Sequence, residues 1–182
     1  SVVIVDEAYV DFGAATALPL LEKYENLLVV QTFSKSRSMA GMRIGFCIGN
    51  EELIACLNDV KYSFNSYTMD QTALILGTAA LRDREYYEKT RAKVIETREW
   101  AKTELRRLGF RFGDSKANFI FASHESVPAR EIYQALREQH IYVRYFDNPR
   151  WANYRGCPGG PREGMAPCFR LVEGGRKEGG VS

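Results

Sequence analysis

The chain contains the stretch Thr32-Phe33-Ser34-Lys35-Ser36-Arg37-Ser38-Met39-Ala40-Gly41-Met42-Arg43-Ile44-Gly45. It places one lysine among small and hydroxyl-bearing residues, with Arg43 following farther along. A lysine that acts as an amine nucleophile must lose its proton, although its ordinary pKa is about 10.4, so it needs a desolvated pocket or a neighbouring cation. Serine hydroxyls and the planar guanidinium of Arg43 are suited to binding a phosphate group. The stretch therefore predicts a site for a phosphorylated aldehyde cofactor that Lys35 holds covalently.

An apolar run lies upstream of that stretch: Val2-Val3-Ile4-Val5-Asp6-Glu7-Ala8-Tyr9. Its β-branched residues and its abrupt end in two carboxylates predict a buried parallel strand. Parallel sheets bind ligands at the carboxyl ends of their strands, which is where Asp6 would lie. There Asp6 could keep a pyridine nitrogen protonated, as a pyridoxal electron sink requires, and Tyr9 could donate to the phenolic oxygen of that ring. Taken alone, a Ser-Lys pair is more often part of a solvated turn, but the two stretches together indicate a cofactor site.

These two stretches resemble the fold-type I aminotransferases that use pyridoxal phosphate, and in particular the class II branch of that family. The lysine signature from Thr32 to Gly41 matches closely. Within that branch the chain looks most like the histidinol-phosphate aminotransferases, on the evidence of Asp6-Glu7-Ala8-Tyr9 with Phe12, and of Ala40-Gly41-Met42-Arg43-Ile44-Gly45. The resemblance extends from Val2 to about Tyr154.

The resemblance implies pyridoxal 5'-phosphate as the cofactor and a role for several residues. Lys35 is implied to form the Schiff base with the cofactor and later to move the proton between the substrate carbon and the cofactor. Asp6 is implied to pair with the pyridine nitrogen, and Tyr9 to bond the phenolic oxygen. Ser34 and Arg43 are implied to hold the cofactor phosphate.

The resemblance also implies an α/β fold, the fold type I of pyridoxal-phosphate-dependent transferases. Residues 1–82 would form the C-terminal part of the large cofactor-binding domain, with a mostly parallel sheet and helices. Residues 83–155 would form a small α+β C-terminal domain that begins with a long linking helix. The tail at 156–182 is rich in glycine and proline and lacks periodicity, so we expect it to be poorly ordered. Because the first residue already lies in a predicted strand, the chain looks like the second half of such an enzyme.

Hydrophobic periodicity gives the elements expected along the chain. We expect strands at 27–32, 43–48, 110–112, 117–122 and 141–146, and helices at 51–60, 69–81, 82–108 and 129–139. The aromatic and polar segment 61–67 has no such periodicity and is expected to be a loop, which either lines the substrate pocket or buries its rings. The helix at 82–108 carries many charges of both signs, which predicts a solvated face.

Two arginines are candidates for binding the anionic groups of the substrate. Arg144 would project from a strand toward the pocket, where a planar guanidinium suits a carboxylate or a phosphate; the alternative is a surface ion pair. For the arginine that clamps the substrate carboxylate in the family, Arg170 is favoured over Arg155 because its surroundings, Cys168-Phe169-Arg170-Leu171-Val172-Glu173-Gly174, look like a strand.

Composition argues against several other classes of function. The chain has 45% hydrophobic and 26% charged residues and a formal net charge of +2 at pH 7, which gives no reason to expect nucleic acid or a membrane as partner. No apolar run approaches the roughly 20 residues of a transmembrane helix, so we expect a cytoplasmic protein. No metal site is predicted: His124 and His140 are expected to be structural, and buried thiols are expected at Cys47, Cys56, Cys157 and Cys168.

The predicted reaction is transfer of an amino group between histidinol phosphate and 2-oxoglutarate, as a step of histidine biosynthesis. A small-molecule amino donor and a 2-oxo acid are therefore the expected partners, and the resemblance implies a homodimer. Other class II aminotransferases and related decarboxylases use the same lysine and aspartate, and they stay open as alternatives. A different class of function also stays open, in which this chain is a non-catalytic fragment that serves as a binding or dimerising module.

Overall fold

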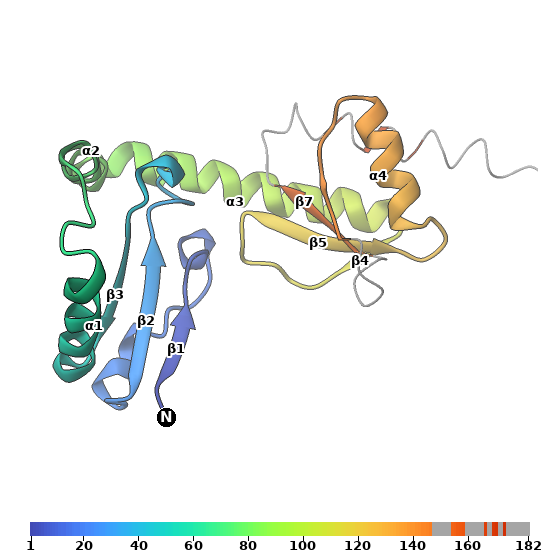
Figure 1. Cartoon of the computed structure of the whole chain (residues 1–182). Helices are drawn as coiled ribbons and strands as arrows, with labels where there is room; N and C mark the ends of the chain where they lie inside the picture. The colour runs from blue at the N-terminus through green and yellow to red at the C-terminus, as the bar shows by residue number, and fades with distance from the viewer. Residues whose placement is uncertain (147–153, 159–165, 167–168, 171–172, 174–182) are drawn as a thin grey trace, which may run out of the picture. The chain divides into compact units, whose positions relative to one another are not determined.

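The computed structural model describes residues 1–146, 154–158, 166, 169–170 and 173 (Figure 1). By its internal contacts the chain divides into two compact units, residues 1–91 and residues 92–182. The division falls inside the long helix α3 (Arg84–Arg107), whereas the sequence places a domain boundary just before that helix. Each unit has a sheet of its own.

The first unit contains a three-stranded sheet in the order β1-β2-β3. Strand β1 (Val3–Asp6) runs parallel to β2 (Leu27–Thr32), as predicted, and β3 (Gly45–Gly49) runs antiparallel to β2. The register pairs Asp6 with Val30 and Thr32 with Gly45. The carboxyl ends of β1 and β2 therefore meet the amino end of β3 at one edge of the sheet.

Short 3-10 turns and two helices complete the first unit: η1 (Val10–Phe12), η2 (Leu18–Glu22), η3 (Ala40–Met42), α1 (Glu51–Phe64) and α2 (Gln71–Arg82). Both helices begin at a capping side chain, because Asn50 accepts from the amide of Glu52 and Asp70 accepts from the amide of Ala73. Such caps satisfy amides that a helix start leaves unpaired. Residues 61–64, predicted as loop, instead form the last turn of α1, since no glycine or proline interrupts the helix before Asn65.

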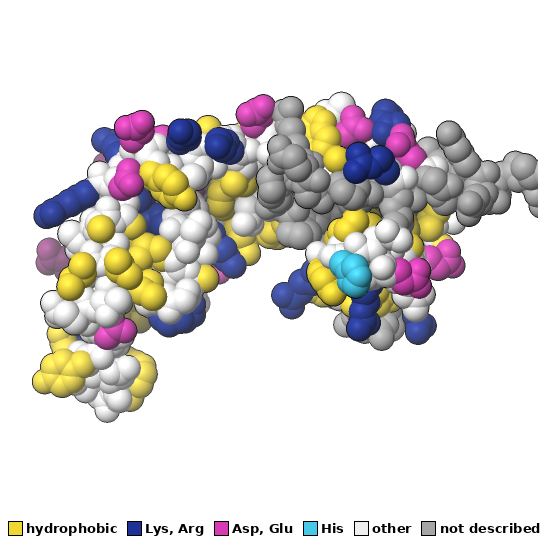
Figure 2. Space-filling model, turned by 90° about the horizontal axis from the view of Figure 1, so that it is seen from above, with side chains coloured by type: hydrophobic (Ala, Val, Ile, Leu, Met, Phe, Trp, Pro, Cys, Tyr) yellow, Lys and Arg dark blue, Asp and Glu magenta, His cyan; other side chains and the backbone are white. Residues whose placement is uncertain are grey.

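The hydrophobic core of the first unit is small and does not include β1. Val29 of β2 is fully enclosed, and Phe33 and Ile44 pack with Ala73 of α2. Val3 is 49% and Ile4 is 63% exposed, so the prediction of a buried first strand is wrong for the described structure. Because β1 is the end strand of the sheet, only β2 pairs with it among the described residues. Hydrophobic side chains also appear in yellow on the face of this unit that Figure 2 shows.

The second unit contains the rest of α3 together with β4 (Phe110–Phe112), β5 (Phe119–His124), α4 (Ala129–Glu138), β6 (Arg144–Tyr145) and β7 (Tyr154–Pro158). Its strands are antiparallel and lie in the order β4-β5-β7-β6. One hydrophobic core joins α3, the sheet and α4, and consists of Ala101, Leu105, Leu108, Phe110, Ile120, Ala122, Ile132, Leu136 and Phe169.

Two expectations for the C-terminal part of the chain are wrong. Residues 156–158 were expected in a poorly ordered tail, but they belong to β7, which pairs with β5 on one side and β6 on the other. Backbone hydrogen bonds to two neighbours hold a strand even where its side chains give no strand signal. Phe169 and Arg170 are helical rather than part of a strand, and Phe169 packs edge-on against Trp100 with ring centroids 5.4 Å apart.

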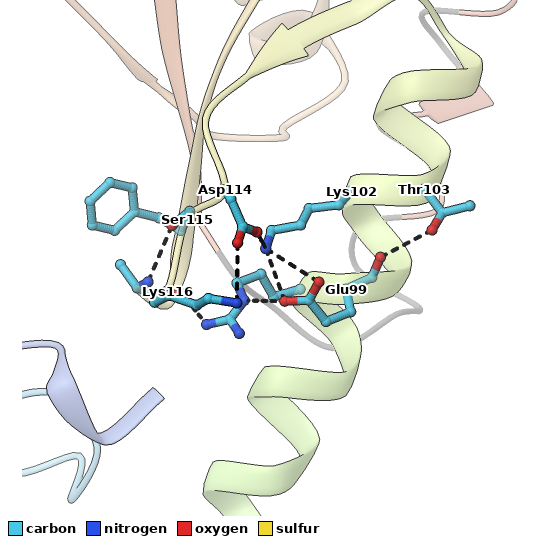
Figure 3. A network of polar contacts seen from close by, with 9 residues as sticks. Glu99, Lys102, Thr103, Asp114, Ser115 and Lys116 are labelled. Atoms are coloured by element: carbon cyan, nitrogen blue, oxygen red, sulfur yellow. Dashed lines mark hydrogen bonds and ion pairs between the residues drawn. The ribbon is translucent and has the colours of Figure 1, made fainter. Parts of the chain in front are cut away.

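The sequence predicted that the charges of α3 lie on a solvated face, but two of its cations are buried. Arg98 and Lys102 are only 3% and 1% exposed. Lys102 Nζ lies 2.7 Å from Asp114 Oδ1 and 3.0 Å from Glu99 Oε1 (Figure 3). Arg98 donates to Glu99 and to the carbonyl of Ala117. These partners compensate for the burial of two cations and hold the segment after β4 against α3.

The cysteines and histidines follow the expectations only in part. Cys47 is half-buried and Cys56 exposed, both as free thiols, so neither is the buried thiol expected; α1, which carries Cys56, has no buried residue at all. The side chains of Cys157 and Cys168 lie outside the described residues. His124 is structural, as predicted: Nε2 lies 3.0 Å from the carbonyl oxygen of Leu108. Within the described part of the chain, no helix has the length and apolar character needed to cross a membrane.

Candidate active site

The predicted cofactor residues of the first unit gather at one edge of its sheet. Asp6 is the last residue of β1, and Ser34 and Lys35 follow the end of β2. Arg43 lies just before β3, whose antiparallel direction brings its first residue to the same edge. The sequence places these residues apart, and the register of the sheet brings them together.

Lys35 is exposed and faces the ring of Tyr9. Its Nζ lies 5.3 Å from the centre of that ring. A cation over an aromatic face at an exposed site is worth about 0.5–1 kcal/mol, so the contact biases the direction of the lysine without burying its amine. Tyr9 and Lys35 are therefore neighbours, as a shared cofactor site requires.

Thr32 shapes the turn that carries Ser34. The Thr32 hydroxyl accepts from the amide of Ser34 at 3.0 Å, and Thr32 Oγ1 and Ser34 Oγ are 2.9 Å apart. The same hydroxyl lies 3.2 Å from the carbonyl oxygen of Ile44. One threonine thus links the segment after β2 to the segment before β3. This role was not predicted from the sequence, although Thr32 stands at the first position of the lysine signature.

Arg43 is exposed and has a left-handed backbone, with φ of 54°. That conformation costs a non-glycine residue about 1–2 kcal/mol, and Ser38 shows it as well, with φ of 56°. Arg43 Nη1 donates to the carbonyl of Ala40 at 2.7 Å. The remaining guanidinium donors leave Arg43 able to bind an anion at this edge.

The two neighbouring carboxylates of the upstream motif have different surroundings. Asp6 is exposed, and its Oδ1 accepts from the amide of Ala8 at 2.9 Å. Glu7 is 7% exposed and accepts from Thr16, from the amide of Ala17 and from Gln31. Glu7 is therefore a structural acceptor, a role that the sequence analysis missed, while Asp6 is accessible to a ligand.

A polar network that was not predicted from the sequence lies beside the lysine. Ser36 Oγ donates to Asp11 Oδ2, and Tyr87 of α3 lies beside the same carboxylate. Burial raises the pKa of Tyr87, and the neighbouring Asp11 carboxylate raises it further. A cavity of about 210 Å³ adjoins this network, lined by Ser36, Arg37, Ala79, Ala80, Asp83, Tyr86, Tyr87 and Thr90. Only the positions of two of these residues could have pointed to the network in the sequence, because Asp11 closely follows Tyr9 and Ser36 adjoins Lys35.

The two candidate arginines for substrate lie in the second unit. Arg144, in β6, is exposed, and its Cζ lies 5.3 Å from the centre of the Phe146 ring. Arg170 is exposed as well. The side chain of Arg155, the alternative to Arg170, lies outside the described residues.

The chemistry of the clustered groups fits pyridoxal phosphate. An accessible carboxylate at Asp6 can accept from a pyridinium N–H, and the phenol of Tyr9 can donate to a ring oxygen. The Lys35 amine can bond an aldehyde carbon. The Ser34 hydroxyl and the Arg43 guanidinium supply donors for a phosphate. All of these groups stand at the edge where open α/β sheets bind their ligands.

Known proteins are similar to this chain in sequence and in fold. A family model described as aminotransferase class I and II matches residues 1–166. A histidinol-phosphate aminotransferase of Clostridium botulinum is 49% identical over 164 residues, which make up 90% of this chain and 46% of that protein. The chain thus spans about half the length of the curated relatives that it matches.

Two solved structures have the same fold. The histidinol-phosphate aminotransferase of Clostridium acetobutylicum has a TM-score of 0.87 at 22% identity, covering 98% of this chain and 55% of that one. The histidinol-phosphate aminotransferase of Sinorhizobium meliloti, solved in complex with pyridoxal-5'-phosphate, has a TM-score of 0.80 at 22% identity, covering 96% of this chain and 49% of that one. These likenesses confirm the predicted fold-type I architecture.

Proposed function

This chain belongs to the family of class I and II aminotransferases, and we propose that it provides the lysine half of an active site for pyridoxal-phosphate-dependent transamination. The observation that carries the proposal is the gathering of Asp6, Lys35 and Arg43 at one edge of the sheet. Half the length of the relatives is present here, so the activity is proposed for the complete site to which this chain contributes.

Each residue of the cluster has a defined task in the proposal. Asp6 accepts from the pyridine nitrogen and keeps it protonated, while Ser34 and Arg43 bind the phosphate. Tyr9 donates to the phenolic oxygen. When bound, pyridoxal phosphate supplies the electron sink that stabilises a carbanion at the substrate carbon. Lys35 would hold the cofactor through its amine, which would bond the aldehyde carbon with loss of water, and the same amine, when free, would take the proton from the substrate α carbon.

For the substrates we propose histidinol phosphate and 2-oxoglutarate, on the 49% identity to a histidinol-phosphate aminotransferase. Both molecules are anionic, which gives the exposed guanidinium groups of Arg144 and Arg170 a role in binding them. A homodimer in the cytoplasm is part of the same proposal and rests on the family resemblance.

The first experiment measures visible absorption after pyridoxal phosphate is added to the purified chain. We expect a band that borohydride abolishes and that Lys35→Ala lacks. The matched control is Lys23→Ala, which removes another exposed lysine of the same unit and should keep the band. Absence of a Lys35-dependent band in the unmodified chain would contradict binding by this chain.

A second measurement addresses the substrate. Where the band forms, addition of histidinol phosphate should change it, and 2-oxoglutarate should then restore it, because the two half-reactions of transamination leave the cofactor as it began. Release of carbon dioxide in place of a 2-oxo acid product would favour the related decarboxylases. A band that no amino donor changes would favour a cofactor-binding module without activity.

A further inference from the structure

We propose that Asp11 is the positioning residue for Lys35, acting through the hydrogen bond that its carboxylate accepts from Ser36 and the one that its backbone carbonyl accepts from Arg91. This pair of contacts is called the Asp11 tether below. The inference rests on the proposed function for its catalytic consequence, but the tether itself is a property of this chain alone.

Asp11 links the two segments that carry the cofactor residues. It lies in η1, two positions after Tyr9, and its Oδ2 accepts from Ser36 Oγ. Ser36 is 8% exposed, whereas its neighbour Lys35 is exposed. The backbone beside the lysine is therefore anchored while the lysine side chain stays accessible, which is the arrangement that a directed nucleophile needs.

Helix α3 supplies the other end of the tether. Arg91 Nη1 donates to the Asp11 carbonyl at 3.3 Å, and Tyr87 of the same helix lies beside the Asp11 carboxylate. Asp11 therefore accepts one hydrogen bond from the lysine segment and one from α3. Losing the carboxylate would release the lysine segment from this link to α3.

Arg37 anchors the lysine segment at a second point. Its Nη1 donates to the carbonyl of Ala80 in α2 at 2.9 Å, and its Cζ lies 4.2 Å from the centre of the Tyr87 ring. Ser36 and Arg37, which follow Lys35 directly, are thus both fixed to the body of the unit. The direction of Lys35 toward the Tyr9 ring is set by anchors that do not themselves meet the proposed cofactor.

The segment offers amides whose exchange reports on the tether without any cofactor. The Ser38 amide donates to the Lys35 carbonyl at 3.1 Å, and the Met39 amide donates to the Phe33 carbonyl at 3.0 Å. If the tether holds this turn, its loss should expose these two amides. The amides of β2 should not respond, because they belong to the sheet.

The test compares Asp11→Ala, Ser36→Ala and the double variant with the unmodified chain and with Asp59→Ala, which removes an exposed carboxylate of α1. Hydrogen exchange of residues 33–39 is measured without cofactor, and the rate of appearance of the Lys35-dependent band is measured with pyridoxal phosphate. We expect exchange roughly tenfold faster or more in either single variant, as for a lost hydrogen bond to a charged acceptor. Band formation should slow by roughly ten- to a hundredfold, as for a misplaced reacting group.

The double variant separates a tether from two independent losses. A shared interaction predicts that the double variant exchanges no faster than Asp11→Ala, whereas independent effects would multiply. Unchanged exchange at 33–39, a multiplied effect, or an equal rise in β2 would each overturn the tether, and Ser36→Ala keeps the test valid if Asp11→Ala does not fold. If the unmodified chain forms no band, the proposed function fails, and the exchange data still decide whether the tether exists. If exchange rises and band formation does not slow, the positioning role is overturned.

Discussion

At the scale of single residues, two adjacent carboxylates show how a motif divides between structure and chemistry. Asp6 and Glu7 look alike in the sequence, but only Glu7 is buried, with acceptor contacts to Thr16, Ala17 and Gln31. Removing a buried acceptor leaves its donors unsatisfied, and this lowers the stability of the fold more than the loss of an exposed contact does. The two residues should therefore affect different properties of the protein when they are changed.

We predict that Glu7→Gln lowers the free energy of unfolding by about 2 kcal/mol, because an amide offers donors where this site needs acceptors for charged hydrogen bonds. Urea unfolding of the chain without cofactor measures the effect. Asp6→Asn is the matched control: it should unfold like the unmodified chain but lose the Lys35-dependent band. Equal unfolding free energies for Glu7→Gln and Asp6→Asn would refute the division of roles.

At the scale of elements, buried cations link α3 to the segment after β4. Asp114 accepts from Lys102, which is 1% exposed, and pairs with Lys116 (Figure 3). The hydrogen bond from Lys102, followed by that from Lys116, lowers the pKa of the Asp114 carboxyl to about 2. The pKa of Glu99 is lowered too: burial alone would raise it, but the hydrogen bonds from Lys102 and Arg98 outweigh that effect.

The sign of the pH dependence follows from these lowered pKa values. A carboxylate whose pKa is lower in the folded state stabilises the fold above its ordinary pKa of about 3.9, and this stabilisation is lost as pH falls toward the folded value. We therefore predict that the second unit loses stability between about pH 4 and pH 2. We would measure the melting temperature at several pH values across this range. It should fall less steeply with falling pH for Asp114→Asn than for Glu125→Gln, whose carboxylate pairs with Arg111 at the surface. Identical slopes for the two variants would contradict the assignment.

The elements also show what the sequence can and cannot predict. The strand before Asp6 and the strand before Lys35 were predictable, because apolar runs that end in polar residues are typical of strands reaching a ligand edge. The direction of β3 was not, since an apolar run reads the same in either direction. Strand β7 was missed because Gly156 and Pro158 give no strand signal. The burial of Lys102 was missed because a charged residue on a helix is expected to face solvent unless its distant partner, here Asp114, is known.

The candidate site, too, was predictable from the sequence only in part. Asp6, Lys35 and Arg43 were predicted to share one site because motif positions in a familiar order imply a geometry. The Asp11 tether was not predicted, because a hydrogen bond between Asp11 and Ser36 joins residues far apart in the sequence, and their positions near Tyr9 and Lys35 do not show that they pair with each other. Contacts of this kind become visible only when the register of the strands is known.

At the scale of the whole molecule, exposed apolar side chains gather on several elements of the first unit. They include Val3 and Ile4 of β1, Val60 and Phe64 of α1, and Leu74 and Ile75 of α2, all at least 47% exposed. The end strand of a sheet with apolar side chains is a template for pairing with another chain. The chain spans about half the length of its curated relatives, so we expect these faces to contact the remainder of the fold where it is present.

We predict that the 182-residue chain alone self-associates through β1, because an open apolar edge gains both strand pairing and burial by association. Sedimentation velocity over a range of concentrations should show species larger than the monomer. Ile4→Lys should shift the distribution toward monomer, since a lysine on an edge strand opposes pairing. Tyr24→Lys is the matched control, because Tyr24 is 55% exposed but lies outside the strands, and it should leave association unchanged. A monomer at every concentration would mean that the β1 edge is closed in solution, and an equal response of both variants would assign the association to net charge rather than to this edge.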